Sequence, residues 1–209
     1  MNYQMKLAEY LLQIKAIKLD ITNHFTWASG WKSPIYCDNR KALSYPVIRT
    51  YIRDAFVELI RDKYPGVEGI AGVATGAIAI GALVADVMNL PFAYVRSKPK
   101  DHGLANLIEG EVIPGQKMVV IEDLVSTGNS SLAAVRALRE QKIKVLGMVA
   151  IFTYDFVVAG EQFRREQVPL FTLTDYPHLI DIAVKTGYVK SQHLESLKAW
   201  RENPENWKQ

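Results

Sequence analysis

Apolar residues along the chain recur in two alternating spacings. Helical spacing predicts helices over residues 7–17, 46–63, 75–88 and 130–141. Pro46 suits the first turn of the second of these helices. Short apolar runs predict strands at 68–73, 92–96, 117–121 and 144–152. Strands that alternate with helices indicate βαβ units. We therefore expect an α/β fold with a central, mostly parallel sheet flanked by helices on both faces.

The two ends of the chain follow different patterns. Residues 25–36 predict short strands around a turn centred on Gly30. Phe163 lies in a further predicted helix, and two helical segments begin at Asp175 and Ser191. Because no linker or repeat divides the sequence, we expect one domain over residues 1–209. The polar segment 97–111 is too long for a simple connection, which favours a functional loop.

Composition narrows the setting of the protein. A net charge of +3 is too small to indicate nucleic-acid binding. Cys37 is the single cysteine, so an internal disulfide is impossible and a reducing, cytoplasmic location is expected. The longest apolar stretch, 77–87, is interrupted by Asp86 and is too short to span a bilayer, and the N-terminus lacks the apolar core of a signal peptide. We expect no membrane partner.

The segment 118–131, which reads MVVIEDLVSTGNSS, carries the strongest chemical signal. Glu122 and Asp123 follow four apolar residues, at the carboxyl end of a strand where open α/β sheets bind ligands. Carboxylates accept hydrogen bonds and therefore suit sugar hydroxyls. Gly128 allows a tight turn into a helix whose free N–H groups can hold a phosphate, and hydroxyl donors stand beside it at Ser126, Thr127 and Ser130. A ribose 5-phosphate fits both halves.

Each half alone would be a solvated strand end or an ordinary turn. In this order, on a strand, loop and helix, they resemble the signature of the type I phosphoribosyltransferases.

Two other patterns are dismissed. Residues 110–117 superficially resemble a nucleotide-binding P-loop, but they precede a strand. Gly72, Gly76 and Gly81 have the wrong spacing for a dinucleotide-binding fingerprint.

A basic cluster opens the long polar segment at residues 96–103, which read RSKPKDHG. It could be solubilising charge. Beside a phosphate site, however, Arg96, Lys100 and His102 suit a departing pyrophosphate, whose growing negative charge cations stabilise. Gly103 and Gly110 would give such a lid the freedom to close.

The motifs at 25–36, 94–103 and 122–130 together resemble the orotate phosphoribosyltransferases, in the form typical of Gram-positive bacteria. The resemblance covers nearly the whole chain. It implies transfer of ribose 5-phosphate from 5-phosphoribosyl 1-pyrophosphate (PRPP) to orotate, giving orotidine 5′-phosphate in UMP biosynthesis. It also implies a hood formed by about residues 1–40 and C-terminal elements, Mg²⁺ complexed with the substrate rather than held by a dedicated metal site, and a homodimer in which the 96–103 loop serves the neighbouring subunit.

The resemblance implies roles for individual residues. Catalytic groups would be Lys100, His102 and Asp123. PRPP would be bound by Arg96, Lys100, His102, Glu122, Asp123, Leu124, Val125, Ser126, Thr127, Gly128, Asn129 and Ser130. Orotate would contact Ser126, Tyr36 and Lys32.

Three positions depart from the enterobacterial form of the family. Ala28 stands in place of a hood lysine, Ser97 in place of a second basic loop residue, and an arginine near Tyr154 is replaced. How the carboxylate of orotate is neutralised is therefore open.

Two alternatives stay open as well. One is a phosphoribosyltransferase for a purine or for uracil, against which the 25–36 motif argues. The other is a regulator that binds the sugar donor without catalysis, against which Lys100 and His102 argue.

Overall fold

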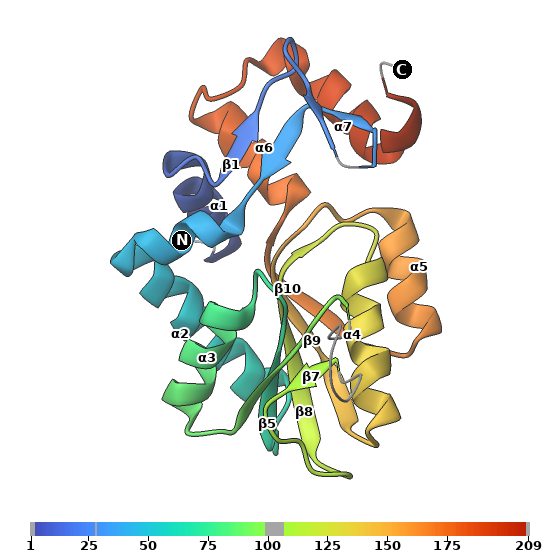
Figure 1. The fold of residues 1–209 in the computed structure, drawn as a ribbon. Coiled ribbons are helices and arrows are strands. Elements are labelled where there is room, and N and C mark those ends of the chain that lie inside the picture. Colours follow the sequence, from blue (N-terminus) through green and yellow to red (C-terminus); the bar gives the residue numbers. More distant parts are fainter. Residues whose placement is uncertain (1–2, 28, 99–106, 208–209) are drawn as a thin grey trace.

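A six-stranded sheet forms the centre of the protein in the computed structural model, which describes residues 3–27, 29–98 and 107–207 (Figure 1). In sheet order the strands are β10 (Leu170–Asp175), β9 (Lys144–Thr153), β8 (Lys117–Val125), β5 (Gly69–Val73), β6 (Phe92–Val95) and β7 (Ile108–Glu109). Neighbouring strands are parallel except for the short edge strand β7. The predicted α/β fold with a mostly parallel sheet is confirmed.

Helices cover both faces of the sheet, as Figure 1 shows. One layer contains α1 (Tyr3–Gln13), α2 (Pro46–Lys63) and α3 (Ile78–Met88), and the other contains α4 (Asn129–Glu140) and α5 (Val157–Arg165). The alternation of β8 side chains explains the two layers. Val119 and Ile121 pack into the core beneath α2, whereas Met118 and Val120 pack into the core beneath α4.

Some boundaries differ from the prediction. The first helix ends at Gln13, not at residue 17, and Ile17 begins β1 (Ile17–Leu19), which pairs with β4 (Ile35–Cys37). Lys15 has a φ of 54°, which breaks the helix although the apolar spacing continues. β8 runs four residues beyond the predicted end because its pairing with β9 continues to Val125. Neither β7 nor β10 was predicted, since β7 is very short and β10 mixes polar with apolar residues.

A second layer of structure lies beyond the carboxyl ends of the parallel strands (Figure 1). It combines N-terminal and C-terminal segments: β1, β2 (Phe25–Thr26), β3 (Lys32–Ser33), β4, α6 (Tyr176–Lys185), η2 (Ser191–His193), α7 (Leu194–Glu202) and η3 (Pro204–Asn206). Trp200 anchors the layer, since it is fully buried against the rings of Trp27, Tyr154 and Tyr176. We call this layer the upper layer.

Besides the turn from α1 into β1, two connections join the upper layer to the layers below it. The short helix η1 (Asn39–Ser44) leads from β4 into α2. Asp175 ends β10 and caps α6 by accepting a hydrogen bond from the His178 backbone N–H at 3.0 Å, which explains the predicted helix start there. Within the described part of the chain, no helix has the length and apolarity needed to cross a membrane.

Candidate active site

The site begins at the carboxyl end of β8. Because β8 lies between β5 and β9 in the middle of the sheet, its apolar residues are buried on both faces, and Glu122 and Asp123 still belong to the strand. The chain then turns through 126–128 into α4. Gly128 provides the turn with a φ of +87°, and an added Cβ there would lie 2.9 Å from the ring of Phe163. Glycine is therefore required at this position for conformation and for space.

A cavity of about 420 Å³ opens above this turn, which we call the phosphate-loop cavity. It is lined by Cys37, Asp38, Arg40, Val73, Ala74, Thr75, Gly76, Glu122, Asp123, Leu124, Ser126, Thr127, Gly128 and Ser130. Three chain segments contribute: the end of β8 with its turn and the start of α4, the end of β4 with the residues that follow it, and the end of β5 with the residues that follow it. The polar character of the lining and the start of α4 suit a phosphorylated sugar.

Glu122 is buried and its two oxygens have partners within the protein. The Ser131 hydroxyl donates to Oε2 at 2.8 Å, and the Asp123 backbone N–H donates to Oε1 at 3.0 Å. Burial, followed by the negative charge of Asp123, raises the pKa of Glu122 well above its usual value. Glu122 therefore ties the strand to α4 as well as bordering the cavity.

Asp123 is held by groups on two other segments. Asn39 donates through Nδ2 to the Asp123 backbone carbonyl at 2.7 Å. Burial raises the pKa of the Asp123 carboxyl, while the positive charge of Arg40 opposes that rise. Arg40 is itself oriented by Asp38, whose Oδ1 lies 2.7 Å from Arg40 Nε. On the other side, Gly76 lies so close to the Asp123 carboxylate that a Cβ would overlap it.

Sequence reasoning missed the segments after β4 and after β5. Gly76 was considered only as part of a dinucleotide-binding pattern, yet it borders Asp123. The Ala74–Thr75 peptide bond beside it is cis. A signal was available: β5 is a parallel strand, so its carboxyl end had to lie on the same sheet edge as that of β8. Cys37, Asp38 and Arg40 carried no such signal.

A second cavity of about 410 Å³ adjoins the first on the side of the upper layer, and we call it the aromatic cavity. It is lined by Thr26, Trp27, Tyr36, Cys37, Leu124, Ser126 and Tyr154. Cys37, Leu124 and Ser126 line both cavities, so they form a shared wall. A ligand with a flat ring on one side and a phosphorylated sugar on the other would fit across this wall.

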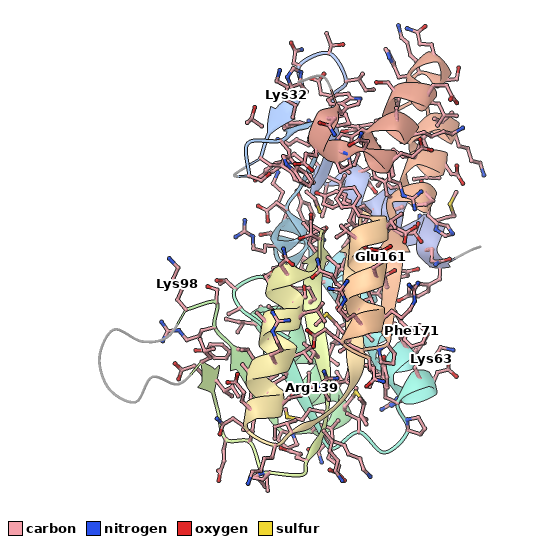
Figure 2. All side chains as sticks on the ribbon, turned by 90° about the vertical axis from the view of Figure 1, so that its right-hand side faces the viewer. Lys32, Lys63, Lys98, Arg139, Glu161 and Phe171 are labelled. Carbon is pink, nitrogen blue, oxygen red and sulfur yellow. The ribbon has the colours of Figure 1, made fainter. Side chains whose placement is uncertain are left out.

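The remaining predicted residues lie in different places. Of the residues named for orotate, Ser126 and Tyr36 line the aromatic cavity. Lys32 lies on β3 in the upper layer, where Figure 2 labels it, and lines neither cavity. Val125 is fully buried in the core beneath α4, and Asn129 begins α4 without lining either cavity.

The basic loop is described only at its edges. Arg96 follows β6, and its Nη1 lies 3.5 Å from Glu109 Oε1, outside the lining of both cavities. Lys100 and His102 lie outside the described residues. Within the described ranges, no cluster of three or more His, Cys, Asp or Glu side chains could hold a metal ion. Glu122 and Asp123 are only two carboxylates, so a metal ion bound beside them would need oxygens of the substrate as its further ligands.

Known proteins resemble this chain over nearly its whole length. Residues 45–168 match the family model for the phosphoribosyl transferase domain. The orotate phosphoribosyltransferase of Bacteroides thetaiotaomicron is 57% identical over 99% of this chain and 97% of its own. That of Cytophaga hutchinsonii is 55% identical over the whole of both chains, and that of Lactococcus lactis subsp. cremoris (strain MG1363) is 54% identical over 99% of both.

Solved structures of orotate phosphoribosyltransferases also resemble this chain. The crystal structure of orotate phosphoribosyltransferase from Aeropyrum pernix has a TM-score of 0.73 at 26% identity, and covers 88% of this chain and 99% of that chain. The Mycobacterium tuberculosis orotate phosphoribosyltransferase in complex with PRPP has a TM-score of 0.64 at 25% identity, and covers 84% of this chain and 98% of that chain. The chain belongs to the orotate phosphoribosyltransferases, within the phosphoribosyltransferase domain family.

Proposed function

We propose that this protein transfers the ribose 5-phosphate group of PRPP to orotate, yielding orotidine 5′-phosphate and pyrophosphate in UMP biosynthesis, in the cytoplasm. The observation that carries the proposal is the pair of adjoining cavities with Ser126 in their shared wall. One cavity offers a phosphate loop and an acidic strand end, and the other offers aromatic walls. The product likewise combines a phosphorylated sugar, which suits the first cavity, with a flat base, which suits the second.

The sugar half would lie in the phosphate-loop cavity. The turn at Ser126, Thr127 and Gly128, with Ser130 on α4, supplies hydroxyl and backbone donors for the 5-phosphate beside the positive end of α4. The carboxylate of Asp123 would accept hydrogen bonds from the ribose hydroxyls and hold the ring in place. Glu122 would support this arrangement through Ser131.

The leaving group would be pyrophosphate. Mg²⁺ would arrive complexed with PRPP, as part of the substrate, and would neutralise phosphate charge, with Glu122 and Asp123 as the neighbouring carboxylates. The bond between the anomeric carbon and pyrophosphate breaks with oxocarbenium character, and the base nitrogen forms the new bond from the side of the aromatic cavity. Lys100, His102 and Arg96 would stabilise the charge that builds on pyrophosphate.

The base half would lie between the rings of the aromatic cavity. The upper layer would act as the hood over the base, with Tyr36 at its edge and Ser126 below. A site that pairs its donors with the orotate carboxylate leaves them unpaired when uracil binds, which costs about 1–3 kcal/mol for each group. We therefore expect strong preference for orotate over uracil.

Product analysis tests this function directly. The purified chain should release pyrophosphate from PRPP with orotate and form orotidine 5′-phosphate, and should use uracil and hypoxanthine poorly. Equal rates with the three bases at limiting concentration would refute the orotate assignment and leave the phosphoribosyltransferase family assignment standing. PRPP binding without turnover of any base would instead identify a regulator.

We also propose that the active form is a homodimer with shared sites, in which Lys100 and His102 serve the phosphate-loop cavity of the neighbouring subunit. A Lys100→Ala subunit and an Asp123→Asn subunit should each be inactive alone. Mixed, they should form heterodimers in which one site is wild-type in both components, so activity should reappear. Absence of recovery in a mixture shown to contain heterodimers would contradict sharing.

A further inference from the structure

Tyr154 lines the aromatic cavity, and its hydroxyl has no hydrogen-bond partner among the described residues. Tyr154 is only 2% exposed, yet the hydrogen bonds that described residues make with it involve its backbone N–H and its backbone carbonyl, not its hydroxyl. Among the described residues, the side-chain polar atoms that are fully buried and have no hydrogen-bond partner are His24 Nδ1, Thr174 Oγ1 and Trp200 Nε1. The Tyr154 hydroxyl is not one of them. Tyr154 lines the aromatic cavity, so a ligand bound there can reach it.

Neighbouring rings hold the Tyr154 ring in one orientation. The ring centroids of Trp27, Phe152, Phe156 and Trp200 lie 5.0–5.6 Å from that of Tyr154. Its backbone is also bound, since the Tyr154 N–H donates to the Val125 carbonyl at 3.2 Å, beside the phosphate loop. A hydroxyl on such a clamped ring is a preorganised donor, because little rotamer freedom remains to be lost when a ligand accepts its hydrogen bond.

The surroundings keep this hydroxyl protonated. Burial raises the pKa of the Tyr154 phenol well above its usual value, and the nearby negative charge of Asp123 adds to the rise. No described residue that lines the aromatic cavity carries a charge at neutral pH, and Lys32 lies elsewhere. The described lining of the aromatic cavity therefore offers only neutral donors to an anionic group bound there.

We propose that the Tyr154 hydroxyl donates a hydrogen bond to the carboxylate of orotate and thereby determines specificity for this base. The inference rests on the proposed function. In orotate the carboxylate is attached to the ring carbon next to the nitrogen that forms the glycosidic bond. That nitrogen must face the phosphate-loop cavity, so the carboxylate must lie near the shared wall of Cys37, Leu124 and Ser126. Tyr154 is the clamped donor on the aromatic side of this wall.

The test compares two tyrosines of the same aromatic cluster. Tyr154→Phe should lower kcat/KM for orotate by about 10- to 100-fold, as expected for loss of a hydrogen bond to a charged group. The variant should leave KM for PRPP and kcat/KM for uracil within about threefold of wild type, and should keep its Tm because the hydroxyl has no partner among the described residues. Tyr176→Phe is the matched control, since Tyr176 donates to the Leu197 carbonyl at 3.0 Å and lines neither cavity. It should lower the Tm and leave orotate use unchanged.

Each outcome separates the two proposals. If wild-type protein forms no orotidine 5′-phosphate, the proposed function itself fails. If wild type is active and Tyr154→Phe uses orotate normally, the role of Tyr154 is refuted while the function stands. An equal loss with orotate and uracil would place the hydroxyl against a ring carbonyl and would overturn the carboxylate contact. A loss accompanied by a fall in Tm like that of Tyr176→Phe would mark a structural role and would also overturn it.

Discussion

Gly76→Ala should disable the site with one added methyl group. Gly76 follows β5, and a Cβ built on it would overlap the carboxylate of Asp123. Its φ does not lie in the left-handed region, so the backbone itself accepts alanine. The substitution therefore acts by pushing the Asp123 carboxylate away from its place in the phosphate-loop cavity.

The size of the effect follows from what Asp123 is proposed to hold. A hydrogen bond to a charged group contributes about 1.5–3 kcal/mol, and two ribose hydroxyls would lose their acceptor. The loss of about 3–6 kcal/mol corresponds to a fall in kcat/KM for PRPP on the order of 10²- to 10⁴-fold. Stability should change little. The carboxylate borders an open cavity into which it can rotate, and alanine restricts the unfolded chain by about 0.4–1 kcal/mol, which offsets part of any strain.

Steady-state kinetics with varied PRPP, together with thermal unfolding, measure both quantities. Gly160→Ala is the matched control, because Gly160 lies within α5 and an added Cβ would meet no atom within 4 Å. It should raise stability by about 0.5–1 kcal/mol and leave activity unchanged. Asp123→Asn should reproduce the kinetic loss without added volume. A folded Gly76→Ala variant with wild-type kcat/KM for PRPP would refute the proposed position of the Asp123 carboxylate.

Four further substitutions test other parts of the site. Glu122→Gln should stabilise the protein at neutral pH and lower activity. Burial raises the pKa of Glu122, so the stability that its protonation provides is fully present below the usual pKa of 4.5 and is lost as the pH rises through the raised pKa. Urea unfolding across pH should show this loss of stability in the wild type but not in the variant. Asn39→Ala removes the donor to the Asp123 carbonyl and should cost about 1–3 kcal/mol in urea unfolding, with a higher KM for PRPP. Lys100→Ala should lower kcat by on the order of 100-fold or more without changing the Tm, and normal turnover would remove Lys100 from the mechanism. Lys32→Ala, outside both cavities, should affect orotate use less than Tyr154→Phe, and the reverse order in kcat/KM would return the carboxylate contact to Lys32.

Patterns along the chain predicted the features that are determined within a single strand, turn or helix. The apolar run before Glu122 and the Gly128 turn predicted a strand, a phosphate loop and a helix, and the structure has β8, the turn and α4 in that order. Pro46 marked the start of α2 correctly. These signals are local, because burial, turn conformation and helix capping each act within a few residues. The helix predicted over 7–17 failed for a local reason as well, at the positive φ of Lys15.

Contacts between elements depend on strand order, which no local pattern specifies. Placing β5 beside β8 is what brings Gly76 against Asp123, and the same spacing of glycines in another strand order would have left Gly76 in an ordinary turn. The sequence shows that Tyr154 carries a hydroxyl. It does not show that this hydroxyl lacks a partner among the described residues, because that depends on four rings that come from β2–β3, β9 and α7 and their connections. A family motif indicates which residue has been replaced at such a position. Only the packing around the replacement shows whether its donor is left without a partner among the described residues. For Tyr154 it is, and this supports our proposal that a neutral hydroxyl binds the orotate carboxylate in a cavity whose described lining carries no cation.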